Sequence, residues 1–131
     1  MKKIAFCIFS FNRGQYLKNC VESIQSCLPN ADIYVFDDNS DDQQTLSVLD
    51  ELKNICNIMT PSGYGKTKHG GLYLNMQTAL EALSHYPLLC FLQDDTQVVR
   101  PVDAQEIDSW VSLFTNNASL GFLHPCFIRG I

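Results

Sequence analysis

Two pairs of adjacent aspartates in this chain each follow a short apolar segment. Asp37 and Asp38 come after the letters IYVF, and Asp94 and Asp95 come after LLCFLQ. Carboxylates gathered at one place repel each other unless a cation or hydroxyl donors satisfy them. Hard divalent ions such as Mg²⁺ and Mn²⁺ prefer oxygen ligands, commonly one or two carboxylates together with substrate phosphates. If the fold brings the pairs together, they predict a site for a divalent cation and an anionic ligand.

The elements that must position these pairs follow an α/β pattern, in which short β-like runs alternate with amphipathic helices. Apolar residues from Leu17 to Leu28 recur at helical spacing, and no internal repeat or low-complexity linker interrupts the chain. The expected strands are 4–10, 33–36, 55–59, 88–92 and 121–128.

Helix-start signals place further helices between these strands. Ser40 and Gln43 have the spacing of a capping box for a helix that buries Leu46 and Leu49, and Asp103 is expected to cap the last helix. The apolar faces expected on the last two helices are Met76, Ala79, Leu80 and Leu83, and then Ile107, Trp110, Val111 and Phe114.

Ligands of open parallel sheets bind in the crevice beyond the carboxyl ends of the strands. That rule selects four segments here, which are 10–13, 37–40, the glycine-rich loop 63–71 and 93–95. Asp, Asn and Ser are ordinary turn residues when they occur alone. Their joint occurrence after strands that this topology brings together favours a ligand site over independent turns.

Composition excludes several classes of protein. The 131 residues are 46% hydrophobic, which suits one domain with a real core, and a net charge of −5 argues against nucleic-acid binding. The longest apolar runs fall far short of the roughly 20 residues that span a bilayer, and no signal-peptide cleavage site follows the start of the chain, so we expect no transmembrane segment and a cytoplasmic location. The six cysteines are dispersed without a CxxC pair, which predicts reduced core thiols.

Two other motifs fit less well. The letters TPSGYGKT at 60–67 imitate a phosphate-binding P-loop, but Thr60 stands where the first glycine belongs, and two glycines at 70–71 would break the following helix. A phosphoacceptor receiver domain has a similar length and acidity. Its aspartate pair follows the first strand and a lysine follows the last, whereas here the pair follows the second strand and Arg129 is the basic residue near the end.

Three motifs in order, IAFCIFSFNRGQYLKNCVESIQS, IYVFDDNSDD and LLCFLQDDTQVV, resemble the amino-terminal half of family 2 glycosyltransferases with the GT-A fold. The resemblance covers nearly the whole chain. It implies a single GT-A-like, Rossmann-like domain over 1–131, with a mostly parallel sheet flanked by helices, incomplete at the C-terminus relative to the full family domain.

The resemblance also implies which residues contact the nucleotide. Ser10, Phe11 and Asn12 would line the nucleotide pocket, with Phe11 packed against the base. Asp38 would accept a hydrogen bond from the base, and Asp94 would lie near the ribose.

The diphosphate and the metal would be held nearby. Lys68 or His69, in the glycine-rich loop, would be the cationic contact of the diphosphate, and Asp95 would bind Mn²⁺ or Mg²⁺. Gln93 stands where many family members have the first aspartate of a DXD motif, and it carries no charge. Gln93 can still accept a hydrogen bond, so the departure from the family pattern is the loss of one charge, which bears on metal affinity and donor preference.

The implied reaction is transfer of a sugar from a nucleoside diphosphate sugar, most simply a uridine diphosphate sugar, to a hydroxyl of a glycan or another acceptor. The general base stays unidentified, because Asp103, Glu106 and Asp108 read as first-turn helix charges. The alternative is a non-catalytic nucleotide-sugar-binding module, or a fragment that lacks the acceptor half and its base. The apolar segment 121–128 could also pair with a second copy of the chain as an exposed strand.

Overall fold

The computed structural model describes residues 2–59 and 71–124. The strands are β1 (Ile4–Ser10), β2 (Asp32–Asp37), β3 (Asn57–Met59) and β4 (Leu88–Gln93). They form one parallel sheet in the order β3-β2-β1-β4, so β1 lies between β2 and β4. The ends of β1, β2 and β4 therefore share one edge of the sheet, as the sequence predicts.

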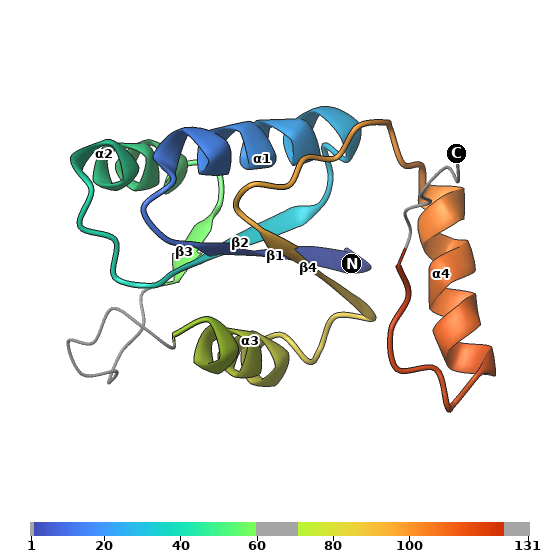
Figure 1. Cartoon of the computed structure of the whole chain (residues 1–131). Coiled ribbons are helices and arrows are strands. Elements are labelled where there is room, and N and C mark those ends of the chain that lie inside the picture. The colour runs from blue at the N-terminus through green and yellow to red at the C-terminus, as the bar shows by residue number, and fades with distance from the viewer. Residues whose placement is uncertain (1, 60–70, 125–131) are drawn as a thin grey trace, which may run out of the picture.

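Helices cover both faces of this sheet. The helices are α1 (Gly14–Cys27), α2 (Gln43–Leu52), α3 (Gly71–Ala82) and α4 (Ala104–Asn116). Figure 1 shows α1 and α2 side by side on one face, α3 on the opposite face, and α4 beyond one end of the sheet. The result is a three-layer α/β arrangement.

The central strand β1 divides the core in two. All seven of its residues are buried, as expected of a parallel strand covered on both faces. Phe6 and Ile8 point into the larger core under α1 and α2, whereas Cys7 and Phe9 point into the smaller core under α3. This alternation fixes the register that places Ser10 at the end of β1 beside Asp37 of β2.

The start of α4 follows the local sequence signal, whereas the start of α2 depends on a tertiary contact. Asp103 caps α4 as predicted, because its side chain accepts a hydrogen bond from the Glu106 N–H at 2.8 Å. The predicted cap of α2 is wrong. Asp42 occupies that position and accepts from the Thr45 N–H at 2.9 Å, whereas the Ser40 hydroxyl donates to a carboxylate of the β2 end.

Two leucines that were predicted to be buried are exposed. Leu46 in α2 is 42% exposed and Leu80 in α3 is 49% exposed. The buried residues of these helices are Thr45, Val48 and Leu52 in α2, and Gly71, Asn75 and Ala79 in α3. The predicted faces are therefore wrong for Leu46 and Leu80, although Leu49 and Met76 pack against the core as expected.

The predicted apolar face of α4 is confirmed, whereas the described part of the last predicted strand is not a strand. The four apolar residues predicted on α4 do pack against the larger core. Of the strand predicted at 121–128, residues 121–124 form no strand in this structure, and 125–131 lie outside the described residues. Phe122 is 78% exposed, so this segment lacks the packing that would hold a strand in place.

A polar cluster lies at the amino ends of the strands, at the opposite edge of the sheet from Asp37 and Asp94. The Tyr86 hydroxyl donates to Asp32, Tyr34 and Tyr86 share a hydrogen bond of 2.9 Å, and Lys2 pairs with Asp32 at 2.8 Å. Burial raises the pKa of the Asp32 carboxyl, but the hydrogen bonds from Lys2 and Tyr86 and the charge of Lys2 outweigh it, so the net pKa is lowered. The cluster joins β2 to the turn before β4.

The cysteines that the structure describes are all free thiols, as predicted. Burial raises the pKa of Cys7 and of Cys20 to about 12, so both are neutral and inert at ordinary pH. Cys126 lies outside the described residues. In the part of the chain that the structure describes, no helix is both long and apolar enough to cross a membrane.

Candidate functional site

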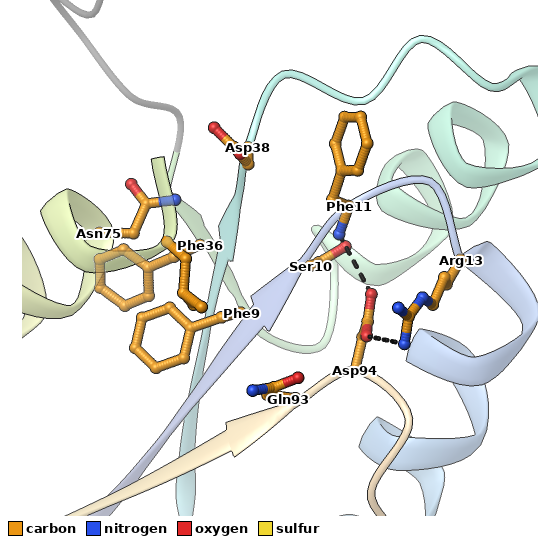
Figure 2. A pocket seen from close by; sticks show the side chains of 10 residues that line it. Phe9, Ser10, Phe11, Arg13, Phe36, Asp38, Asn75, Gln93 and Asp94 are labelled. Carbon is orange, nitrogen blue, oxygen red and sulfur yellow. Dashed lines mark hydrogen bonds and ion pairs between the residues drawn. The ribbon is translucent and has the colours of Figure 1, made fainter. Parts of the chain in front are cut away.

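A cavity of about 170 Å³ opens at the carboxyl edge of the sheet, between β1, β2, β4 and the start of α3. Figure 2 shows its side chains converging from these elements. The residues that line it are Phe9, Ser10, Phe11, Arg13, Phe36, Asp38, Leu72, Asn75, Gln93 and Asp94. The cavity therefore lies where the topology rule places a ligand.

Aromatic side chains form one wall of the cavity. Phe9 of β1 and Phe36 of β2 have ring centroids 5.7 Å apart, and Phe91 of β4 meets Phe9 edge to face at 5.1 Å. Figure 2 shows Phe9 and Phe36 close to Asn75 of α3. Because Phe9 and Phe36 are buried in the smaller core, this wall is rigid and apolar.

Asp37 joins the ends of β1 and β2. Its buried carboxylate accepts hydrogen bonds from the Ser10 hydroxyl at 3.0 Å, the Ser40 N–H at 2.8 Å and the Ser40 hydroxyl at 2.7 Å. The Ser40 oxygen in turn accepts from the Asn12 N–H at 2.9 Å. Ser10 thus lines the cavity while its hydroxyl is already bonded within the protein.

Asn12 braces the loop after β1 against the loop after β2. Its side-chain oxygen accepts from the N–H groups of Asp41 and Asp42 at 3.0 and 3.1 Å, and its amide nitrogen donates to the Asp41 carboxylate at 2.8 Å. Its φ of 49° lies in the left-handed region, which asparagine tolerates better than most residues. Asn12 is not among the residues that line the cavity.

Asp94 is the buried member of the second aspartate pair. Its carboxylate accepts from the Phe11 N–H at 3.1 Å, and its own N–H donates to the Phe9 carbonyl oxygen. Burial raises the pKa of Asp94 and the charge of Asp95 raises it further, against the Phe11 N–H and the Arg13 charge, which lower it. The net pKa of Asp94 is raised, chiefly because burial disfavours the charged form of its carboxyl.

Arg13 supplies the positive charge at that strand end. Its guanidinium donates to the Asp95 carboxylate at 3.1 Å and lies 3.6 Å from the Asp94 carboxylate. Figure 2 shows it between the start of α1 and the end of β4. Sequence analysis did not assign Arg13 a role, although a lone cation after the first strand, with an acid pair after the fourth, was a signal that could have found it.

Asp38 lies against the first residue of α3. A Cβ added to Gly71 would come 1.8 Å from the Asp38 carboxylate oxygen, so only glycine permits this approach. The positive end of the α3 dipole also favours a carboxylate at this position. The Asp38 N–H donates to the Ser10 carbonyl oxygen at 2.9 Å, which extends the β1–β2 pairing by one residue.

The structure brings most of the predicted site residues together. Ser10, Phe11, Asp38 and Asp94 line one cavity, and Asp95 is adjacent to it. Lys68 and His69, the predicted diphosphate contacts, lie outside the described residues.

The donor atoms at the end of β4 suit a hard divalent cation. Asp95 is about half exposed and can be reached from solvent, and it offers carboxylate oxygens. No group of three or more His, Cys, Asp or Glu side chains that could hold a metal occurs in the described part of the chain. A cation held by Asp95 would therefore need phosphate or water oxygens to complete its ligands, which is usual for Mg²⁺.

Comparisons with known proteins bear on the fold and on the family. A family model described as Glycosyl transferase family 2 matches residues 5–101. The crystal structure of S. aureus TarS 1-349 in complex with UDP is similar over 88% of this chain, with a TM-score of 0.63 and 18% sequence identity. This chain spans 32% of that chain, about a third of its length. No curated protein matches the sequence. The predicted α/β, GT-A-like fold class is thereby confirmed.

Proposed function

Because this chain belongs to glycosyl transferase family 2, we propose that its cavity binds a nucleoside diphosphate sugar, whose sugar is transferred to an acceptor hydroxyl. Uridine diphosphate is the proposed nucleotide, and a glycan is the proposed acceptor. The observation that carries the proposal is the convergence of Phe11, Asp38 and Asp94 on one cavity at the carboxyl edge of the sheet. A structure of similar fold was solved in complex with UDP, which supports the choice of uridine.

The proposed nucleotide contacts differ in kind. Phe11 offers an aromatic face for the base, Asp38 an acceptor for a base N–H, and Asp94 an acceptor near the ribose. Ser10 and Asn12 act on the same pocket from behind, because their side chains bond to Asp37 and to the 41–42 segment and so hold the two loops in place. Lys68 and His69 remain the predicted cationic contacts of the diphosphate.

We propose that Asp95 holds Mn²⁺ or Mg²⁺ against the diphosphate. When bound, such an ion stabilises the negative charge that grows on the leaving diphosphate, more in the transition state than in the ground state. The hydrogen bond from the Phe11 N–H to the Asp94 carboxylate keeps the end of β4 in the position where Asp95 can do this. Transfer also requires a base for the acceptor hydroxyl, and no residue of this chain is assigned to that step.

The cytoplasmic location, the single domain over 1–131 and the pairing of two copies through 121–128 also remain predictions from the sequence.

Calorimetric titration with uridine, guanosine and adenosine diphosphates tests the proposal, in the presence of Mn²⁺ and then of a chelator. We expect selective binding of uridine diphosphate that weakens at least tenfold with the chelator. Asp95→Ala should abolish the effect of Mn²⁺, whereas Asp50→Ala, which removes an exposed aspartate of α2, should leave it unchanged. Equal binding of all three nucleotides, or none, would contradict the proposed function.

A further inference from the structure

Arg13 is the only lysine or arginine among the described residues that line the cavity. It is the residue directly before α1, and no hydrogen bond from its side chain caps that helix. Its side chain is 50% exposed and reaches across to the end of β4, where it contacts both aspartates. A single guanidinium therefore compensates the charge of two neighbouring carboxylates at this edge of the sheet.

The two partners of Arg13 need it to different degrees. Asp94 is buried, so water cannot solvate its charge, and it depends on the Phe11 N–H and on Arg13. Asp95 is half exposed and solvated, although it makes the shorter contact with Arg13, 3.1 Å against 3.6 Å. The bond to Asp95 is therefore the contact that Arg13 can give up at low cost, because exposed ion pairs contribute little.

The proposed ligand changes this balance. A nucleoside diphosphate brings negative charge into a cavity already lined by Asp38 and Asp94, and among the described residues that line this cavity Arg13 is the one lysine or arginine. An arginine fork suits phosphate oxygens, which it can bind with two parallel hydrogen bonds. As long as Arg13 is bonded to Asp95, one of its guanidinium N–H groups is occupied within the protein and does not bind phosphate.

We propose that Arg13 is a positioning residue that exchanges partners: it holds Asp95 in the ligand-free protein and turns to the diphosphate when a divalent cation takes its place at Asp95. This inference rests on the proposed function and adds a role for a residue outside the predicted site. Arg13 and the cation compete for the same carboxylate, and the diphosphate relieves the competition. Bound metal therefore raises the affinity for the nucleotide by releasing Arg13, in addition to its own contact with the diphosphate. By linkage, bound nucleotide raises the affinity for the metal by the same factor.

Binding of Mn²⁺ alone tests the competition directly. Free Mn²⁺ is measured by electron paramagnetic resonance during titration of the full chain, without nucleotide. Arg13→Met should bind Mn²⁺ about fivefold more tightly than the wild type, since it removes one positive charge next to the half-exposed Asp95. Lys18→Met removes one positive charge from the first half of α1, where Lys18 pairs with Glu51, and should change the affinity less than twofold. Equal affinities in the wild type and Arg13→Met would overturn the inference.

The effect of the metal on nucleotide affinity tests the exchange. Uridine diphosphate is titrated with and without Mn²⁺, and the ratio of the two affinities is compared between variants. We expect this ratio to fall at least threefold in Arg13→Met. Arg13→Lys retains a charge without the fork, so it should bind Mn²⁺ as the wild type does and recover part of the nucleotide affinity. Because this variant conserves the charge beside Asp94, it carries the test if Arg13→Met fails to fold.

The outcomes separate this inference from the proposed function. Metal-dependent binding of uridine diphosphate with an unchanged ratio in the Arg13 variants would refute the exchange and leave the proposed function standing. Absence of uridine diphosphate binding in the wild type would refute both.

Discussion

Replacement of Asn12 tests whether the loops beside the cavity are held by one side chain. Asn12→Ala removes the three side-chain hydrogen bonds to the 41–42 segment and leaves a residue with a Cβ at φ 49°. Asn12→Gly removes the same bonds, but glycine adopts this φ without strain. The pair of variants therefore separates the bonds from the backbone conformation.

The structure gives the expected magnitudes. Each of the three bonds is exposed to solvent and contributes about 0.5 kcal/mol, at the low end of the usual net range. The left-handed conformation costs an alanine about 1 kcal/mol more than an asparagine or a glycine. Since glycine also increases the entropy of the unfolded chain by about 0.5 kcal/mol, we expect losses of about 2.5 kcal/mol for Asn12→Ala and about 2 kcal/mol for Asn12→Gly.

Urea unfolding followed by circular dichroism measures these losses. Asn19→Ala, in α1, removes an exposed bond to Gln15 and should stay within about 0.5 kcal/mol of the wild type. Uridine diphosphate should bind both Asn12 variants more weakly, because the loops beside the cavity are held less firmly. If both variants are as stable as the wild type, or if glycine costs clearly more than alanine, the account of Asn12 as a brace is wrong.

Two further predictions concern the start of α3 and the opposite edge of the sheet. Gly71→Ala forces the Asp38 carboxylate to move, so it should destabilise the fold by about 1–3 kcal/mol and weaken uridine diphosphate binding, whereas Gly121→Ala, whose Cβ meets nothing within 4 Å, should do neither. Tyr86→Phe should destabilise the fold by about 1 kcal/mol at neutral pH through loss of its bond to Asp32. Because the pKa of Asp32 is lowered on folding, this stabilisation is present above the usual carboxyl pKa and lost as pH falls through the depressed value, so unfolding curves of Tyr86→Phe and the wild type should converge below about pH 4. A difference that stayed constant down to pH 2 would contradict this assignment.

Local pattern was sufficient to predict much of the fold. Short apolar runs alternating with amphipathic helices indicated a parallel α/β sheet, and Asp103 was recognised as a cap from a signal four residues long, Asp103 to Glu106. Where two residues could cap a helix, the outcome depended on contacts made after folding. The Ser40 hydroxyl donates to the Asp37 carboxylate, and Asp42 caps α2 in its place.

In the site, too, the sequence predicts where the strand ends lie but not which side chains contact each other across long sequence separations. Topology alone placed the ends of β1, β2 and β4 at one edge, which gathers Ser10, Asp38 and Asp94 around one cavity. The roles of Asn12 and Arg13 depend on partners about 30 and 80 residues away, respectively. Such contacts follow from the strand register and the loop lengths together. The residue types can suggest the pairing of Arg13 with the acid pair, but they do not fix either contact.

The central claim is that the cavity at the carboxyl edge of the sheet is where a uridine diphosphate binds. Nuclear magnetic resonance of the ¹⁵N-labelled chain, titrated with uridine diphosphate and Mg²⁺, locates the ligand most directly. We predict amide shift changes concentrated in 9–13, 37–40 and 93–95, with Asp32 and Tyr86 at the opposite edge unaffected. Shift changes centred on the opposite edge, or none in these three segments at saturating nucleotide, would contradict the account.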